Sequence, residues 1–160
     1  MKMEFYNSSS FFERNKQAYE DVRSEVWRVL PSARIEHIGA SAVEGLISKG
    51  DLDVFVGVDY QNFDESIVKL MSLGYREKEG TLRTDSLCMF VVDRYPWDAA
   101  VQLVSNDSEF EFFLEFRDKL KANEGLAQEY NKLKMECAGM EPDEYREVKS
   151  RFIEDVLCIS

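Results

Sequence analysis

The chain has 160 residues, of which 44% are hydrophobic and 32% are charged, and it includes eleven Phe, seven Tyr and two Trp. This length fits one domain over residues 1–160, and so much apolar material can form a core, which excludes intrinsic disorder. The 31 acidic and 20 basic residues give a formal charge of −11, which repels phosphate backbones and anionic bilayers. We therefore expect neither nucleic acid nor a membrane as a partner.

The first half of the chain predicts two helices and two strands. Ser8–Ser10 can cap the first helix, and Pro31 follows its last apolar position. The second helix has Asn62 as its candidate cap and Gly74 at its end. A Gly- and Ser-containing segment, 39–50, separates the two strands, and the continuous apolar run of the second strand is typical of burial on both faces. The predicted elements are helix 8–30, strand 34–39, strand 52–58 and helix 62–73.

The second half predicts two more strands and then only helices. Gly125, Gly139 and Pro142 separate the helical segments. The predicted elements are strands 87–92 and 98–104 and helices 108–122, 126–137 and 142–157. The pattern indicates an α/β (α+β) fold with a small central sheet, flanking helices and a helical C-terminal third.

Cysteine use and hydropathy bear on the compartment. Cys88, Cys137 and Cys158 are odd in number and widely spaced, which favours reduced thiols over a disulfide framework. The N-terminus lacks the apolar core of a signal peptide, and no apolar run approaches the roughly 20 residues of a membrane span. We expect a soluble, cytoplasmic protein.

The strongest chemical signal is a pair of carboxylates at the start of the second predicted strand. Asp51 and Asp53 are two residues apart, so both project from the same face of a strand. One or two carboxylates together with substrate phosphates are the usual Mg²⁺ ligands. Upstream, the small-residue turn at Gly39 and Ser41 would let backbone amides and a hydroxyl approach a phosphate. The alternative is that the two acids form a solvated strand end or cap a helix.

The small-residue turn followed by an Asp-x-Asp strand resembles the signature of the nucleotidyltransferase superfold. That resemblance implies a third carboxylate from a neighbouring strand, and three residues compete for that place. Asp98 and Gln102 share one face of the strand predicted over 98–104, and Asp93 precedes it. Asp98 is our candidate third catalytic acid, although it lies beside a turn, and Gln102 is a poor ligand for Mg²⁺.

Two further side chains near the turn could contact phosphates. His37 is the sole histidine of the chain, and it is either a partly buried structural residue or a donor to a phosphate or base. Lys49 precedes Asp51 and could neutralise a phosphate as a point charge, or it could be merely solvated.

These segments together resemble the GrpB family, and the resemblance runs from about Ile35 to Leu157. Separate motifs occur in the family's order: a His-Ile-Gly segment with a following Lys and Asp, a Phe-Arg-Asp helix, and two closing helices. The matching positions in this chain are 37–46, Lys49, Asp53, 114–120, Tyr130, Leu133, Lys134, Tyr145, Lys149, Phe152 and Ile153.

The resemblance implies a nucleotidyltransferase-like fold and, through some relatives joined to a coenzyme A biosynthetic kinase, a link to nucleotide metabolism. Three departures stand out. Ala40 replaces the family's Ser after the glycine, Gln102 stands where the family usually has His, and Asp51 adds an acid that many members lack.

Our leading hypothesis is a protein that binds Mg²⁺ (or Mn²⁺) and a nucleoside triphosphate, and that transfers a nucleotidyl group to a small-molecule acceptor. Asp51 and Asp53 would hold the metal, while His37, Gly39, Ser41 and Lys49 would lie near the nucleotide. The N-terminal fifty residues carry no net charge, so this turn is the part of the acidic chain that repels an anion least. The alternative is a non-catalytic ligand- or protein-binding module with a degenerate site.

Overall fold

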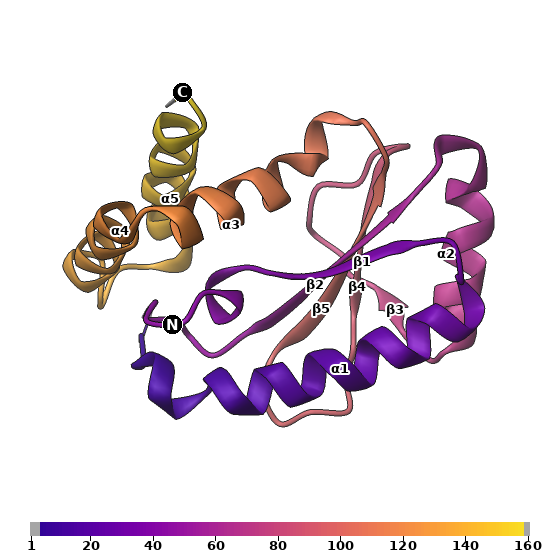
Figure 1. Ribbon diagram of the computed structural model, residues 1–160, viewed down its shortest axis with the longest axis horizontal. Helices are drawn as coiled ribbons and strands as arrows, with labels where there is room; N and C mark the ends of the chain where they lie inside the picture. The colour runs from indigo at the N-terminus through magenta and orange to yellow at the C-terminus, as the bar shows by residue number, and fades with distance from the viewer. Residues whose placement is uncertain (1–3, 159–160) are drawn as a thin grey trace.

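The computed structural model describes residues 4–158 and contains one five-stranded mixed sheet at its centre (Figure 1). The strand order is β1-β2-β5-β4-β3, in which β2 and β5 are parallel and the other neighbouring strands antiparallel. The strands are β1 (Arg34–Ile38), β2 (Leu52–Val58), β3 (Arg76–Glu77), β4 (Leu87–Val91) and β5 (Ala99–Ser105). The mixed sheet confirms the expected fold class. The two-residue strand β3 was not predicted, because it is too short to have a periodic pattern.

One face of the sheet packs against α1 (Phe12–Val29) and α2 (Phe63–Ser72). Alternate residues of β2 and β5 point to this face, and they form the largest apolar cluster with the buried stripes of the two helices. Every residue of β2 except Asp53 is buried, which confirms the prediction from its continuous apolar run. The members from the central strands and from α1 are Leu52, Val54, Val56, Val58, Val101, Leu103, Ala18, Val22 and Val26.

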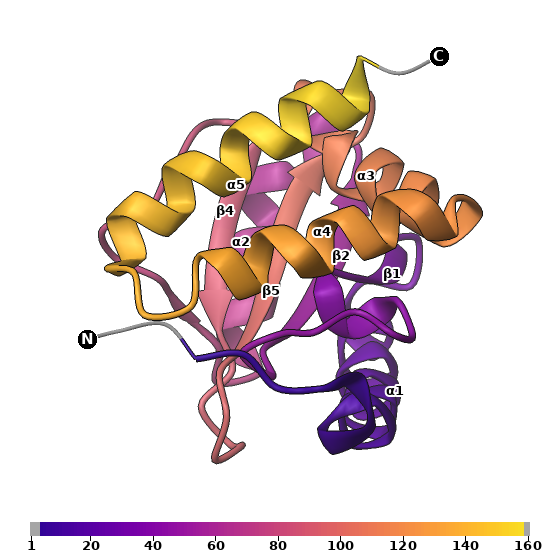
Figure 2. The same cartoon turned by 90° about the vertical axis from the view of Figure 1, so that its left-hand side faces the viewer.

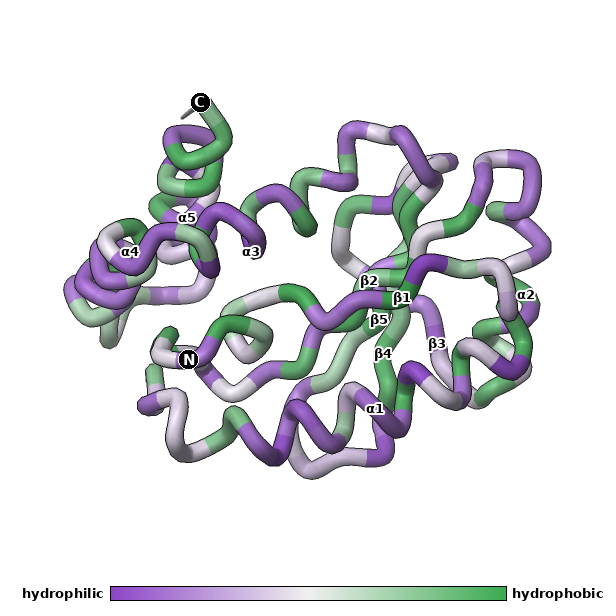
Figure 3. Tube along the Cα trace, in the orientation of Figure 1, coloured by the Kyte–Doolittle hydropathy of each residue, from purple (hydrophilic) through white to green (hydrophobic). Residues whose placement is uncertain are grey.

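On the opposite face, α3 (Phe112–Ala122) packs against the sheet, and α4 (Glu124–Glu136) and α5 (Pro142–Leu157) pack against α3. In Figure 2 α4 and α5 lie in front of the sheet, and Figure 1 shows them beside α3, at the end of the molecule away from α2. Phe55, Val104 and Ile38 pack against Leu114 of α3. A separate cluster joins the helices to one another and to the loop before β2 through Leu46, Leu120 and Tyr130, among others. The helices alternate apolar and polar residues along the chain, as Figure 3 shows, because each has only one buried stripe.

The helix starts differ from the predictions at three places. Ser8–Ser10 form a separate 3₁₀ turn, and α1 begins at Phe12 without a side-chain cap. Asn62 precedes α2, but its side chain caps nothing. Gly125 lies inside the first turn of α4 instead of separating two helices, because the side chain of Asn123 caps that helix by accepting from the amide of Leu126.

Among residues 4–158, no helix is both long enough and apolar enough to cross a bilayer. All three cysteines are free thiols, of which Cys88 and Cys137 are buried and Cys158 is exposed. This agrees with the expectation of reduced cysteines.

Candidate functional site

Strand register brings Asp53 onto the sheet face that the C-terminal helices cover. Asp53 alternates with Leu52 and Val54, which belong to the opposite core, so its side chain shares the face of Phe55. Asp51 lies one residue before β2, whose bounds are those predicted. Both carboxylates nevertheless line the same cavity, of about 840 Å³, together with Lys49.

The turn that follows β1 touches Asp53 directly. Ile38 pairs with Asp53 across β1 and β2, and Gly39 follows with φ 77° and ψ −178°, a conformation that only glycine adopts readily. A Cβ at Gly39 would lie 2.8 Å from Oδ2 of Asp53. Glycine is therefore required here both for the backbone angles and for room beside the carboxylate. The short 3₁₀ turn Ala40–Ala42 follows, and it buries Ser41.

The acid pair is electrostatically strained without a cation. Burial, followed by the charge of Asp51, raises the pKa of Asp53 to about 6, although Lys149, Lys49 and Lys78 act in the opposite direction. Nζ of Lys49 lies 3.4 Å from Oδ2 of Asp51. A positive ligand stabilises the ionised form of a largely buried carboxylate that lies beside a second carboxylate.

His37 points away from the acid pair. It alternates with Ile38 on β1 and stacks on Tyr19 of α1, with ring centroids 5.0 Å apart. Its Nε2 lies 3.0 Å from Oγ of Ser41. Burial, with smaller effects from Lys121 and Arg117, lowers the pKa of His37 to about 4, so the ring is neutral at neutral pH. His37 reaches the turn through Ser41 and does not face Asp53.

The position opposite Asp53 on β5 is occupied by a residue without a carboxylate. Ala100 pairs with Asp53, and Gln102 pairs with Phe55 one step further along the same face. The side chain of Gln102 is 4% exposed, and its Oε1 has no hydrogen-bond partner among the described residues.

The two acids considered for the third place precede β5, and both line the cavity that holds Asp51 and Asp53. Asp98 is exposed and lines the cavity with Asp51 and Asp53, while its carbonyl accepts from the amide of Leu52 at 2.9 Å. Asp93 makes an ion pair with Arg76 at 2.8 Å. Within residues 4–158, no group of three or more His, Cys, Asp or Glu side chains is arranged to hold a metal ion. The role of Asp98 as third acid stays a prediction.

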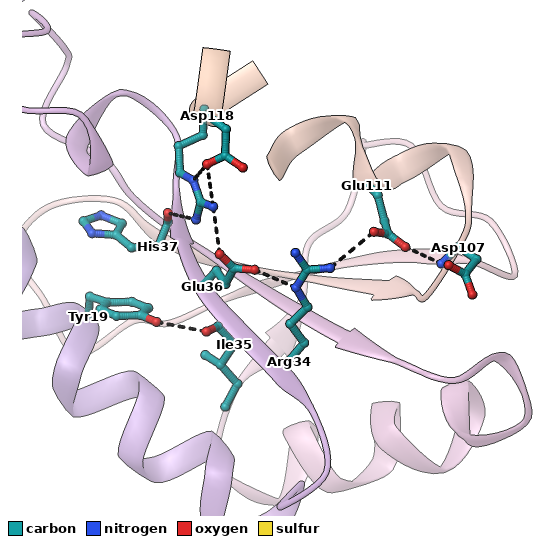
Figure 4. A network of polar contacts seen from close by, with 9 residues as sticks. Tyr19, Arg34, Ile35, Glu36, His37, Asp107, Glu111 and Asp118 are labelled. Carbon is teal, nitrogen blue, oxygen red and sulfur yellow. Dashed lines mark hydrogen bonds and ion pairs between the residues drawn. The ribbon is translucent and has the colours of Figure 1, made fainter. Parts of the chain in front are cut away.

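Arg117 of α3 ties β1 to the C-terminal helices. Its guanidinium donates to the carbonyl of His37 at 3.1 Å and to the carboxylate of Glu36 at 2.7 Å, and it also binds Asp118. Figure 4 shows Glu36 between this contact and its ion pair with Arg34. These bonds fix the strand that leads into the Gly39 turn.

The loop before the acid pair is held by α1 and α4. Arg14 and Asn15 of α1 donate to the carbonyl of Gly50 at 2.6 and 3.0 Å. On the other side, Asn131 and Lys134 of α4 bind the loop around Ile47. None of these four was singled out from the sequence as a site residue, and a polar residue in a buried helix stripe is the signal that could have identified them.

The residues present fit a divalent cation with two protein ligands. Asp51 and Asp53 supply hard oxygen atoms, the pKa of Asp53 is raised by burial and by its neighbour, and Gly39 has no Cβ to crowd Oδ2 of Asp53. Mg²⁺ accepts such a set because it commonly keeps one or two carboxylates and takes its other ligands from water and phosphate.

Comparison with known proteins identifies relatives over nearly the whole chain. The model of the family described as "GrpB protein" matches residues 11–158. A UPF0157 protein from Vibrio cholerae is 45% identical over 155 residues, covering 97% of this chain and 82% of that one. A UPF0157 protein from Deinococcus radiodurans is 33% identical over 138 residues, covering 82% and 71% respectively.

Two kinds of solved structure share the fold. The conserved protein GrpB from Enterococcus faecalis superposes with a TM-score of 0.71 at 18% identity, covering 96% of this chain and 99% of that chain. Cid1, described as having RNA terminal uridylyl transferase activity, superposes with a TM-score of 0.52 at 14% identity. That match covers 72% of this chain but 38% of Cid1. The fold is therefore nucleotidyltransferase-like, as the sequence motifs implied.

Proposed function

The chain belongs to the GrpB family, and on that premise we propose that it binds a nucleoside triphosphate together with Mg²⁺ or Mn²⁺ and transfers a nucleotidyl group to a small-molecule acceptor. The observation that carries the proposal is the contact between the Gly39 turn and Asp53. It joins a glycine-only turn, suited to phosphate, to a carboxylate pair whose ion-pair partner is the exposed Lys49.

Different residues of the chain bind the cation and the phosphates, on two sides of the cavity. Asp51 and Asp53 hold the cation, and the backbone of the turn at Gly39 with the hydroxyl of Ser41 lies nearest to the phosphates. Lys49 is exposed enough to exchange its ion pair with Asp51 for a phosphate. A divalent ion held by the acids would supply charge neutralisation of the phosphates and orientation of the reacting groups.

The binding step is tested by thermal unfolding with each of four nucleoside triphosphates, with and without Mg²⁺ or Mn²⁺. We expect stabilisation that requires both nucleotide and metal, because neither alone neutralises the site. The Asp53→Asn variant should lose this stabilisation, whereas Asp85→Asn, an exposed carboxylate bonded to Tyr60, should retain it. An unchanged ligand shift in Asp53→Asn would refute the metal site.

A specific observation favours the alternative, a non-catalytic binding module. The β5 residues that face the acid pair are Ala100 and Gln102, so β5 provides no carboxylate on the Asp53 face. Nucleotidyl transfer needs a group that removes the acceptor's proton, and Asp98 is the nearest candidate by strand position.

An assay of pyrophosphate release distinguishes the two functions. It measures release from a bound nucleoside triphosphate in the presence of candidate hydroxyl and amine acceptors. We expect turnover that Asp98→Asn reduces by roughly 100-fold, the ordinary contribution of a general base. Metal-dependent binding without any pyrophosphate release across the acceptor panel would favour the binding module.

A further inference from the structure

Two loops of the cavity carry acids of the proposed site, and both lie at the same edge of the sheet. Residues 48–51 lead into β2 and include Asp51, and residues 92–98 lead into β5 and include Asp98. Because β2 and β5 are parallel neighbours, both strands start at this edge. The amide of Leu52 donates to the carbonyl of Asp98 at 2.9 Å. The separation of the two acids therefore depends on what holds these loops.

Helix α1 holds the first loop through the backbone carbonyl of Gly50. Nη2 of Arg14 donates to this carbonyl at 2.6 Å, and Nδ2 of Asn15 donates to it at 3.0 Å. Asn15, which is fully buried, also donates to the carbonyl of Asp51 at 3.3 Å. Gly50 adopts a φ of 93°, and a Cβ there would lie 3.0 Å from Nη2 of Arg14. The guanidinium group is therefore packed closely against the backbone that leads into Asp51.

The same guanidinium group contacts the second loop through Trp97. Cζ of Arg14 lies 3.9 Å from the centroid of the Trp97 ring, within the range of a cation–π contact. Trp97 also stacks on Tyr95, with ring centroids 4.9 Å apart. The hydroxyl of Tyr95 donates at 3.4 Å to the carbonyl of Ala18, about one helical turn after Arg14. Helix α1 thus holds the residues that come directly before Asp98.

This contact region leaves three buried polar atoms without a hydrogen bond. They are Nε of Arg14, Oδ1 of Asn15 and Nε1 of Trp97, which are three of the six such side-chain atoms found in residues 4–158. An unsatisfied buried polar group lowers stability, and apolar side chains could fill the same space without that cost. The arrangement therefore points to a role for Arg14 beyond packing.

We propose that Arg14 is a positioning residue, which connects the loop of Asp51 to the loop of Asp98 by binding Gly50 and Trp97 at the same time. Trp97 lines the cavity but Arg14 does not, so Arg14 acts on the loops and not on a ligand. It fixes the separation between a metal ligand and the candidate base. The identity of the ligand rests on the proposed function, whereas the connection between the loops is a property of the unliganded chain.

The charge of Arg14 and its positioning role predict opposite effects on metal binding. If Arg14 acted only as a positive charge beside the acid loop, its removal would strengthen the binding of a cation. If it positions that loop, its removal should weaken cation binding, because residues that orient metal ligands typically contribute about 10- to 100-fold in affinity. In Arg14→Met we expect Mn²⁺ to bind roughly tenfold more weakly without nucleotide, as measured by electron paramagnetic resonance.

A matched control lies on the same helix. Arg23 is placed over the ring of Trp27, with Cζ 5.5 Å from the ring centroid, and its side chain is 42% exposed. Arg23→Met removes the same kind of contact away from the cavity, so it should leave the affinity for Mn²⁺ unchanged.

Hydrogen exchange tests the connection between the loops without any ligand. The amide of Gly50 is bonded within the first loop, and the amide of Val92 is bonded across the second. Both amides should exchange about tenfold faster in Arg14→Met, because each loop loses a contact to α1. Trp97→Leu changes only the second loop, yet it should also speed exchange at Gly50, because Arg14 loses its aromatic partner. Amides of α2 should not change, which distinguishes this effect from general destabilisation.

The two variants have separate outcomes. Equal or tighter Mn²⁺ binding in Arg14→Met, or unchanged exchange at Gly50 in Trp97→Leu, would overturn the assignment. Trp97→Leu keeps the test valid if Arg14→Met folds poorly. A wild-type protein that binds neither Mn²⁺ nor nucleotide would defeat the metal–nucleotide proposal instead. Faster exchange of both loops in Trp97→Leu would still support the connection through Arg14 in that case.

Discussion

At the scale of single residues, the molecule is organised around the contact between Gly39 and Asp53. The glycine's backbone angles bring the turn against a carboxylate that is partly buried and close to a second acid. Both features cost stability in the unliganded protein, which is common where a site is built to receive a ligand. The two costs can be measured separately, because one is steric and the other is electrostatic.

The steric cost is tested by a pair of glycine substitutions. Gly39→Ala places a methyl group 2.8 Å from Oδ2 of Asp53, whereas a methyl group at Gly45, with φ 94°, would meet nothing within 4 Å. Both variants incur the cost of a positive φ, about 1–3 kcal/mol, but only Gly39→Ala must also displace the carboxylate. We expect Gly39→Ala to be the less stable in urea unfolding and to lose metal-dependent nucleotide binding. Equal losses in both variants would contradict the Asp53 contact.

The electrostatic cost gives a pH-dependent prediction for Asp53→Asn. The native pKa of Asp53 is raised from 3.8 to about 6, so between these values the folded protein binds more protons than the unfolded chain. Stability from this group is therefore lost as the pH rises through that window. At about pH 7.5 and without metal, Asp53→Asn should be more stable than the wild type by about 1–3 kcal/mol.

The measurement is denaturant unfolding in chelator at a series of pH values. The advantage of Asp53→Asn should shrink as the pH falls from about 6 to 4. Asp98→Asn, which changes an exposed carboxylate of the same cavity, should show little advantage at any pH. A destabilised Asp53→Asn at neutral pH would mean that the carboxylate makes favourable contacts that outweigh its burial.

At the scale of elements, the site depends on contacts between segments far apart in the chain. Helix α3 reaches β1 through Arg117, and helix α4 reaches the loop before β2 through Asn131 and Lys134. Arg117 and Lys134 each bind a backbone carbonyl group, and Arg117 also binds Glu36. Asn131 binds backbone groups of the loop. Together these contacts fix the path of the chain on either side of the Gly39 turn.

The Arg117 contact provides a test with a built-in control. The side chain of Arg117 is 11% exposed and bridges Glu36, Asp118 and the carbonyl of His37. Arg117→Ala should lower the free energy of unfolding by about 1–3 kcal/mol, because the carbonyl of His37 loses this donor and Glu36 is left with Arg34 alone. Asp118→Ala should cost less than about 1 kcal/mol, because that carboxylate is 61% exposed. Similar losses in urea unfolding would show that Arg117 acts only through its surface pair with Asp118.

The sequence predicts most elements and fewer of the site's contacts, for a physical reason. Apolar periodicity is local, so it reveals the strand Leu52–Val58 and the C-terminal helices to within a few residues. Side-chain alternation likewise places Asp53 opposite the α1 face. The orientation of His37 depends on which face α1 covers, and that is decided by tertiary packing, which no local pattern contains.

The lysines of α4 and α5 illustrate the same limit. Lys134 and Lys149 appear in the sequence as matches to a family motif, yet the contact of Lys134 with the carbonyl of Ile47 depends on how α4 packs against the loop before β2. The repeated tyrosine–lysine spacing is visible in the sequence, but only the structure shows that Tyr130, Lys134 and Tyr145 are buried.

At the scale of the whole molecule, the acid excess restricts which partners of a nucleotidyltransferase-like fold are admissible. The N-terminal fifty residues have equal numbers of acids and bases, while the rest of the chain carries the net charge of −11. A small nucleotide can be accommodated locally by a metal ion and a few lysines. A polynucleotide extends over many phosphates and meets the repulsive field of the remaining surface.

This difference predicts how the protein treats RNA, although Cid1, with the same fold, is described as an RNA terminal uridylyl transferase. We expect no saturable binding of a labelled single-stranded oligonucleotide at about 0.15 M salt in a fluorescence polarisation titration with Mg²⁺ present, under conditions where nucleoside triphosphate stabilises the protein. A cationic site that grips a strand would release counterions, so its affinity would rise steeply as the salt is lowered. Saturable binding with that salt dependence would contradict the small-acceptor proposal, because it would require a basic track along the surface. The matched comparison is a double variant, Glu144→Lys with Glu147→Lys, which reverses the charge of two exposed acids on α5. If charge is what excludes RNA, this variant should bind the oligonucleotide more strongly than the wild type. Its metal-dependent response to nucleotide should stay the same.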